Sequence, residues 1–230
     1  MTRRTVGVLF AAALLIAAMH VAAVRGLADA HYTSARLTLA EAAPANRAQL
    51  RPVPPRPEAL ALAQASVREA LALEPSNPLF VEQSARLQEL HALGLRRGDP
   101  AIRDGLRQSL AQYRVAAAMR PGSPYVWANI AMLKARLDDM DFEFYGALER
   151  AGRLGPWEPQ VQIAMIDVGL TAWTWLARPG RDLVLGALER GLLRQEPEIR
   201  RIATIHGTLP RVCTDAGGRL PRIAALCVRK

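Results

Sequence analysis

The chain opens with a long run of apolar positions. Residues 5–24 carry no formally charged side chain, and as a helix this 20-residue run would span about 30 Å, the thickness of the hydrocarbon core of a bilayer. Apolar and small side chains then recur at helical spacing through residues 26–43. The pattern predicts an N-terminal membrane helix and a second helical segment that continues from it or lies beside it.

The pattern changes twice after this segment. Five prolines between residues 44 and 57 predict an extended linker. From Glu58 onward, apolar positions recur every three or four residues between short polar breaks, which is typical of amphipathic helices. The expected helices cover approximately residues 58–73, 78–94, 101–119, 124–137, 140–153, 160–177 and 181–194, with shorter pieces near 198–206 and 221–228.

A proline motif punctuates these helices. The pattern Ala-x4-Pro-x2-Pro occurs three times, beginning at Ala70, Ala116 and Ala151. Its first proline ends one helix and its second begins the next, where a missing N–H costs nothing. Asn77 and Ser123 precede two of the second prolines and are expected N-caps, whereas Glu158 in the third copy is a poor one. Three such corners predict an all-α array of helix pairs.

The spacing of the motif resembles that of a tetratricopeptide repeat. Pro121 and Pro156 lie 35 residues apart, close to the period of about 34 residues in that family. Lys134 stands where an aromatic residue is usual, and Phe144 where alanine is usual. The resemblance covers roughly residues 58–194 and implies a short solenoid of antiparallel helix pairs. The residues that match the family pattern are Trp127, Ile130, Ala131, Leu148 and Ala151.

These observations divide the chain into four expected parts. Residues 1–25 are the membrane anchor, and residues 26–57 are a helix followed by the proline-rich linker. Residues 58–194 are the tetratricopeptide-like repeat domain. Residues 195–230 are a basic C-terminal segment with two cysteines.

A narrower resemblance is carried by longer strings in the best repeat. They are Trp127-Ala-Asn-Ile-Ala-Met-Leu-Lys134, Asp141-x-Glu-Phe144, Ala147-Leu148 and Gly155-Pro-Trp-Glu-Pro159-Gln-Val-Gln162. Over residues 120–176 the chain is similar to the VpsP-like accessory proteins of bacterial exopolysaccharide loci. The resemblance implies a single-pass membrane protein that serves polysaccharide synthesis or export, and it supplies no catalytic residues.

The net charge of +9 is confined to the two ends of the chain. Residues 1–25 contribute +3 and residues 200–230 contribute +6, so the stretch between them is neutral, with 20 basic and 20 acidic residues. A neutral repeat body does not favour nucleic acid as a partner.

The apolar run also predicts where the body lies. Arg3 and Arg4 precede the run, so the positive-inside rule places the N-terminus in the cytoplasm and the body in the periplasm. The string Ala28-Asp-Ala30 resembles a signal peptidase site, which leaves a cleaved signal peptide as the alternative. The length of the run, and Arg25 ahead of that site, favour an uncleaved single-pass anchor in the inner membrane.

The two cysteines, Cys213 and Cys227, form no CxxC motif. In an oxidising compartment they would close a loop of about 15 residues as a disulfide. Two free thiols are the alternative.

The chain offers no arrangement that points to an enzyme. It contains no Ser/His/Asp set, no metal-ligand spacing and no glycine-rich phosphate loop, so we expect no catalytic residues, no cofactor and no metal. The acidic residues between 138 and 143 precede an expected helix, where carboxylates cap free N–H groups. We interpret them as capping residues rather than as a cation site.

Four residues remain as candidates for an interaction surface. Asn129 lies in mid-helix, where it either makes an internal hydrogen bond or faces a ligand groove, and Lys134 interrupts the same apolar stretch. Trp157 and Trp173, with Trp175, either belong to the core or form a stacking platform for sugar rings.

The expected function is therefore that of an anchored scaffold. It would bind other proteins of a polysaccharide assembly or export complex. The alternative is a carbohydrate-binding module of the same pathway.

Overall fold

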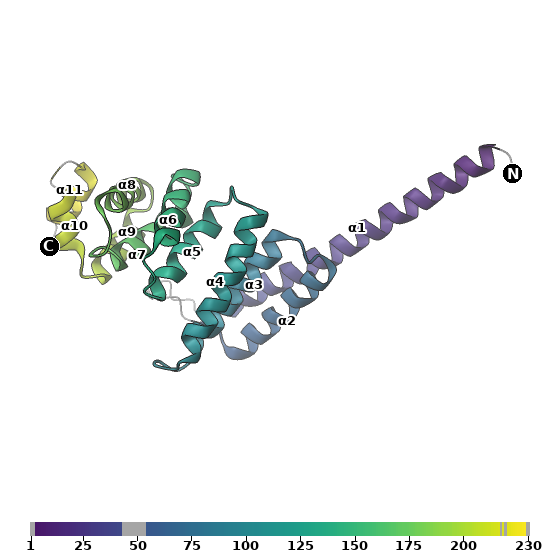
Figure 1. Ribbon diagram of the computed structural model, residues 1–230, viewed down its shortest axis with the longest axis horizontal. Helices are drawn as coiled ribbons and strands as arrows, with labels where there is room; N and C mark the ends of the chain where they lie inside the picture. Colours follow the sequence, from purple (N-terminus) through teal and green to yellow (C-terminus); the bar gives the residue numbers. More distant parts are fainter. Residues whose placement is uncertain (1–2, 43–53, 217, 219, 229–230) are drawn as a thin grey trace.

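The computed structural model describes residues 3–42, 54–216, 218 and 220–228 (Figure 1). All regular structure within these residues is helical, as the sequence pattern predicts. The helices are α1 (Arg3–Ala42), α2 (Pro57–Leu73), α3 (Pro78–Gly94), α4 (Ala101–Met119), α5 (Pro124–Arg136), α6 (Phe142–Leu154), α7 (Pro159–Thr171), α8 (Arg178–Arg194), α9 (Glu196–Ile205), α10 (Leu209–Ala216) and α11 (Pro221–Val228).

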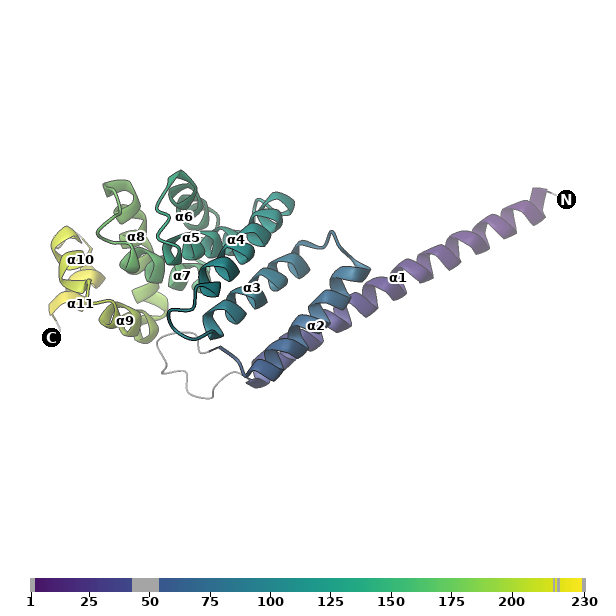
Figure 2. The same ribbon diagram turned by 60° about the horizontal axis from the view of Figure 1, so that its bottom comes forward.

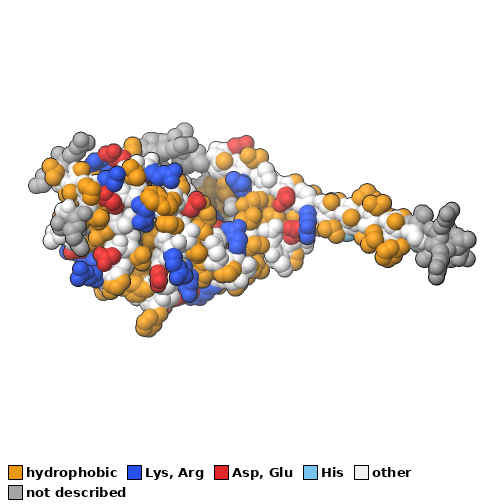
Figure 3. All heavy atoms as spheres, turned by 90° about the horizontal axis from the view of Figure 1, so that it is seen from above, with side chains coloured by type: hydrophobic (Ala, Val, Ile, Leu, Met, Phe, Trp, Pro, Cys, Tyr) orange, Lys and Arg blue, Asp and Glu red, His pale blue; other side chains and the backbone are white. Residues whose placement is uncertain are grey.

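The first half of α1 projects from the body as a rod (Figures 1 and 2). The stretch Leu9–Ala42 is long and apolar enough to cross a membrane, and its most apolar window is entirely unburied. Large side chains such as Phe10 and Ile16 are more than 60% exposed there. Charged side chains in Figure 3 gather over the body and the base of the rod. A lipid environment would shield this apolar surface from water.

The second half of α1 belongs to the body. It packs along α2, and Ala28 and Ala35 are fully buried there. The ring of Tyr32 lies 5.2 Å from that of Phe80 in α3. Of the two arrangements open for residues 26–43, the helix continues directly from the anchor. The part of α1 that precedes the expected boundary at residue 57 therefore packs against the helices that follow this boundary. The proline-rich linker between them lies mostly outside the described residues.

The body is a row of helix pairs. Neighbouring helices α1–α2, α3–α4, α5–α6 and α7–α8 pack together, and each pair contacts the next. Figure 2 shows α4, α6 and α8 along one side and α3, α7 and α9 along the other. One continuous apolar core runs from α3 to α11, and two smaller clusters join α1 and α2 to α3. The α10–α11 hairpin covers the end of the row against α8.

The three proline corners end and begin helices as predicted, but their caps differ. Asn77 accepts a hydrogen bond from the N–H of Leu79 and caps α3. Ser123 makes no cap bond, because its hydroxyl instead accepts a bond from Arg120 Nη2 at 2.9 Å. The expectation of a Ser123 cap was therefore wrong. Glu158 is also not a side-chain cap, as expected.

The second and third corners share a further bond. The fourth residue of the following helix donates to the carbonyl of the first proline of the corner. Trp127 Nε1 reaches Pro121 O at 2.7 Å, and Gln162 Nε2 reaches Pro156 O at 2.8 Å. Equivalent positions therefore perform the same task in successive repeats, although their side chains differ.

Two helix boundaries depart from the prediction. α7 ends at Thr171 rather than near residue 177, although the apolar pattern continues to Leu176. The residues between form turns, with the N–H of Trp175 and of Leu176 both bonded to the carbonyl of Ala172. Pro179 lies in the first turn of α8, where its missing N–H costs nothing, so it is compatible with a new helix that begins at Arg178. The eight-residue α10 was not predicted.

Candidate functional site

A groove runs along one side of the row of pairs, across α1, α3, α5, α7 and α9. It has a volume of about 980 Å³ and is lined mainly by the odd-numbered helices, the first members of successive pairs. On α3 the lining residues are Leu79, Glu82, Gln83, Arg86 and Glu89, whose spacing of three and four places them on one face of the helix. We call this cavity the groove. Its other lining residues include Tyr32 and Arg36 of α1, Tyr125, Asn129 and Met132 of α5, Ile163, Ala164 and Asp167 of α7, and Glu198, Arg201 and Ile202 of α9.

A buried carboxylate with two arginines lies in the groove wall. Glu89 is only 1% exposed. Arg86 Nη1 lies 2.6 Å from one of its oxygens, and Arg136 of α5 contacts the other. The trio joins α3 to α5 across 47 residues of sequence. A carboxylate buried in this way must be paired, and the two guanidinium groups supply that pairing.

Tyr113 of α4 forms part of the groove floor. The residue is fully buried, and its hydroxyl has no hydrogen-bond partner among the residues that the structure describes. Burial, followed by the negative charge of Glu89, raises the pKa of this phenol far above its ordinary value. The hydroxyl therefore stays protonated and can donate a hydrogen bond.

A second ion pair lies nearby. Arg120 Nη2 is 3.2 Å from Glu82 Oε2. Burial raises the pKa of Glu82, and this effect exceeds the lowering caused by the positive charge of Arg120. Together the two pairs make the α3 side of the groove strongly polar.

The middle of the groove is apolar. Ala128 and Met132 of α5 face it with Ile163 and Ala164 of α7. Short alanine side chains beside longer ones leave room for a side chain from a bound molecule.

Asn129 lies in this part of the groove. It is half-buried and makes no hydrogen bond with any described residue. Of the two alternatives left open for Asn129, the structure supports the groove-facing residue rather than the internally bonded amide. Its amide is free to bond to a ligand.

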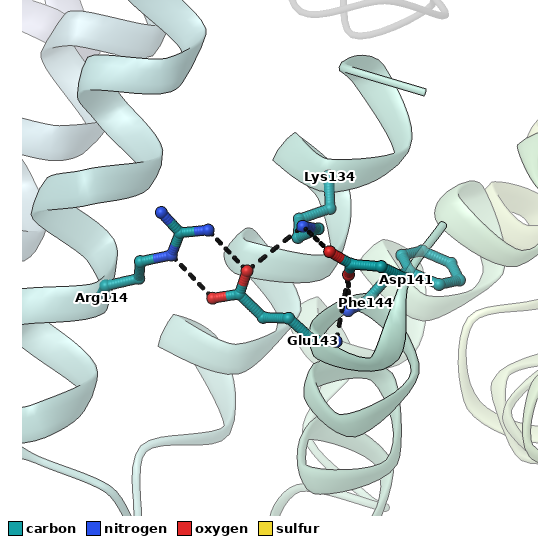
Figure 4. Close-up of polar contacts among 5 residues, drawn as sticks. All are labelled: Arg114, Lys134, Asp141, Glu143 and Phe144. Carbon is teal, nitrogen blue, oxygen red and sulfur yellow. Dashed lines mark hydrogen bonds and ion pairs between the residues drawn. The ribbon is translucent and has the colours of Figure 1, made fainter. Parts of the chain in front are cut away.

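Lys134 lies outside the groove, and its place in an interaction surface was predicted wrongly. The residue is 3% exposed. Its Nζ is 2.7 Å from Asp141 Oδ2 and 3.2 Å from Glu143 Oε2, while Arg114 of α4 holds Glu143 through two bonds of 2.7 and 2.6 Å (Figure 4). This cluster ties α4, α5 and α6 together.

The two basic residues of this cluster lower the pKa values of its two carboxylates. The bond from Lys134 lowers the pKa of Asp141, and the bonds from Arg114 and then Lys134 lower the pKa of Glu143. Asp141 also accepts bonds from the N–H groups of Glu143 and Phe144, at 3.0 and 3.1 Å. Capping of α6 by an acidic residue, as predicted for residues 138–143, is thus confirmed for Asp141.

The proposed tryptophan platform is not formed. Trp173 is 1% exposed, and its Nε1 donates to Asp215 of α10 at 3.1 Å. Trp157 is 52% exposed, with the guanidinium of Arg190 at 5.8 Å from its ring, and Trp175 is 70% exposed. Trp173 therefore belongs to the core beneath the terminal hairpin, contrary to its assignment as a surface residue, and none of the three tryptophans lines the groove.

The two cysteines are joined. A disulfide connects Cys213 in α10 to Cys227 in α11, with the two Cα atoms 5.9 Å apart. Glu189 of α8 accepts bonds from the N–H groups of Arg222 and Ile223 at the start of α11. The disulfide and these bonds hold the terminal hairpin closed and against α8.

Sequence reasoning missed most of the groove. The signal present in the sequence was the charged series Glu82, Arg86 and Glu89, whose spacing marks one helix face. It did not reveal which arginine from another helix would meet it. No protein-family model and no curated protein matches the chain.

Proposed function

We propose that this chain is a membrane-anchored, tetratricopeptide-like scaffold whose groove binds a segment of a partner protein during polysaccharide synthesis or export. The observation that carries the binding role is the groove, a cavity of about 980 Å³ that combines paired charges with an apolar middle. Repeat proteins use such extended surfaces for binding. The groove's glutamates are held in ion pairs, as suits a binding surface better than a catalytic one.

The pathway is supported by resemblance alone. The strings of residues 120–176 are similar to those of the VpsP-like accessory proteins, and the single candidate membrane helix suits a single-pass member of such a complex. The carbohydrate-binding alternative has lost the platform that motivated it, because Trp173 is buried.

The packing of α1 supports an uncleaved anchor. Cleavage after Ala30 would remove Ala28, which packs in the cluster with Ala70 and Phe80. It would also remove Arg25, whose Nε lies 3.3 Å from Glu74. Retention of these contacts favours an uncleaved anchor. The proposed orientation, with the N-terminus in the cytoplasm and the body in the periplasm, rests on Arg3 and Arg4 ahead of the apolar run.

Photo-crosslinking in intact cells tests the binding role. Benzoylphenylalanine replaces Asn129 in the groove or, as a matched control, the exposed Glu149 on α6. We expect a discrete adduct from position 129 and none from 149, with an envelope protein of polysaccharide assembly as the captured partner. Equal adducts from both positions, or none from 129, would contradict the groove as the binding surface. A partner from another pathway would contradict only the pathway.

A reporter enzyme fused to the C-terminus tests the topology. Alkaline phosphatase is active only after export, so an active fusion in the membrane fraction, at the mass of the uncleaved chain, is expected. An inactive fusion, or a chain shortened by about 30 residues, would contradict the proposed anchor.

A further inference from the structure

The groove carries opposite net charges at its two ends. On the side of α1 and α3, four arginines and two glutamates line it, including Arg120 just before α5 and Arg136 at the end of α5, which gives a net charge of +2. On the side of α7 and α9, Asp167, Glu198 and Arg201 give a net charge of −1. A bound molecule with a complementary charge distribution would therefore be favoured in one orientation.

The positive end contains an excess of positive charge on partly exposed arginines. Arg86 and Arg136 share the single carboxylate of Glu89, so this trio retains one unneutralised positive charge. The neighbouring pair of Glu82 and Arg120 is neutral and does not compensate for it. Because the two guanidinium groups are partly shielded from water, an anion placed beside them would be attracted more strongly than by a fully solvated charge.

Arg36 adds a second free positive charge from α1. Its guanidinium lies 5.7 Å from the ring of Tyr32, and no described carboxylate lies within ion-pair distance of it. Arg36 is exposed on the groove side of α1 and so can reach an incoming anion without losing an existing salt bridge. It differs in this respect from Arg86, Arg120 and Arg136.

Tyr113 supplies an unused donor at the same end. Its hydroxyl is buried at the floor of the groove and has no partner in the described protein. A buried hydroxyl without a partner costs free energy, and that cost is recovered if a ligand accepts its hydrogen bond. Excess positive charge, an unpaired arginine and an unpaired donor thus converge on one end of the groove.

We propose that the groove selects a partner segment that is both acidic and apolar. A carboxylate of that segment lies at the α1 end, near Arg36 and above Tyr113, and its apolar side chains lie between α5 and α7. This inference rests on the proposed function, since it specifies the segment that the groove binds. The apolar middle favours a peptide over an acidic polysaccharide, because sugar hydroxyls would lose water against Met132 and Ile163 and the amide of Asn129 could replace few of the lost hydrogen bonds.

Selection from a display library tests the inference. A library of random dodecapeptides is selected on the full chain in lipid nanodiscs, and the enriched peptides are measured by fluorescence anisotropy at several salt concentrations. We expect enrichment of Asp or Glu together with Leu, Met or Phe, and an affinity that falls as salt rises. Enrichment of basic or charge-free peptides would overturn the proposal.

Three variants connect the selected peptide to the site. Arg36→Glu should weaken binding about tenfold or more, whereas the same change at the exposed Arg153 of α6, outside the groove, should not. Tyr113→Phe should weaken binding about tenfold while leaving thermal stability unchanged or raised, because the hydroxyl has no partner to lose within the protein. If Tyr113 had only a structural role, Tyr113→Phe would lower the thermal stability and leave the binding affinity unchanged. Unchanged affinity in Arg36→Glu would overturn the proposal.

The remaining outcomes separate this inference from the proposed function. If position 129 crosslinks a partner in cells but the library yields no groove-dependent peptide, the inference fails and the binding role stands. If neither experiment succeeds, both fail. If oligogalacturonate displaces a selected peptide and binds more tightly than any peptide, the groove binds an anionic glycan and the proposed peptide is wrong.

Discussion

Replacement of glycine by alanine is expected to have opposite effects on the free energy of unfolding at two positions, Gly169 of α7 and Gly186 of α8. A Cβ added to Gly169 of α7 would lie 2.3 and 2.5 Å from the two Cγ atoms of Val184 and 2.9 Å from its Cβ. Val184 is fully buried, and rotating its side chain moves the Cγ atoms but leaves the Cβ in place. Gly169→Ala therefore forces the two helices apart.

Whether each substitution stabilises or destabilises the protein depends on the balance between helix propensity and the cost of overpacking the core. Alanine gains about 1 kcal/mol over glycine in the interior of a helix. Overpacking a well-filled core costs about 1–3 kcal/mol, and a backbone displacement belongs at the upper end of that range. We expect a net loss of about 2 kcal/mol for Gly169→Ala. At Gly186 of α8 the added Cβ would lie 3.1 Å from the nearest guanidinium nitrogen of Arg190, and a shift of a few tenths of an ångström by the end of this flexible side chain would relieve the contact. Gly186→Ala should instead gain up to about 1 kcal/mol.

Thermal unfolding of the full chain in detergent micelles, followed by circular dichroism with the disulfide intact, measures both effects. For a chain of this size 1 kcal/mol corresponds to about 2–4 °C in Tm. Gly169→Ala should therefore lower Tm by about 4–8 °C, and Gly186→Ala should raise it by up to about 4 °C. A Gly169→Ala protein as stable as the wild type, or two variants that shift in the same direction, would refute the close approach of α7 and α8.

Three further outcomes follow from other contacts. Lys134→Met should cost only about 1 kcal/mol in guanidine unfolding, because Asp141 and Glu143 are partly exposed to water; a loss above about 3 kcal/mol would contradict this. In the folded protein the pKa values of Asp141 and Glu143 lie below their ordinary values of 3.8 and 4.5. The two ionised carboxylates therefore stabilise the fold fully above those ordinary pKa values, and this stabilisation is lost as the pH falls through the lower pKa values of the folded state. Acid titration should therefore destabilise the wild type more steeply below about pH 4.5 than the Asp141→Asn, Glu143→Gln double variant; parallel curves would contradict the shifts. Cys213→Ser should remove about 3 kcal/mol of local stability and speed hydrogen exchange in α10 and α11 but not in α3; uniform acceleration along the chain would show that the hairpin is not a separate unit.

The sequence predicted the parts of the fold that depend on local chemistry. The proline corners fix where α3, α5 and α7 begin, since proline lacks an N–H and limits the residue before it. The acidic cap at Asp141 follows from an equally local rule. These signals act within a few residues, so a single sequence is enough to detect them. The disulfide closes a short loop, since its cysteines lie 14 residues apart, and the sequence left two free thiols as the alternative.

The predictions that were wrong concern residues whose partners lie in distant segments of the chain. In the sequence Lys134 is an isolated charge on an apolar stretch. Its partner Asp141 follows only after a turn, and Arg114, which binds Glu143 in the same cluster, lies on the preceding helix. Trp173 appeared to continue a helix, whereas α10, more than 30 residues later, covers it. Arg136 meets Glu89 across 47 residues. Periodicity identifies the buried face of a helix but not the helix that will lie against it.

The continuity of α1 relates the groove to the membrane. α1 contains the predicted span and also contributes Tyr32 and Arg36 to the groove, without a break in the helix. Arg36 follows Val24, the end of the apolar run, by 12 residues, which corresponds to about 18 Å along the helix axis. The Arg25–Glu74 ion pair links the base of this helix to the first proline corner. If residues 5–24 are the proposed anchor, an unbroken helix would hold Arg36 within about 20 Å of the bilayer, whereas a flexible tether would not fix this distance. On the proposed function, the acidic segment would therefore bind the groove close to the membrane surface.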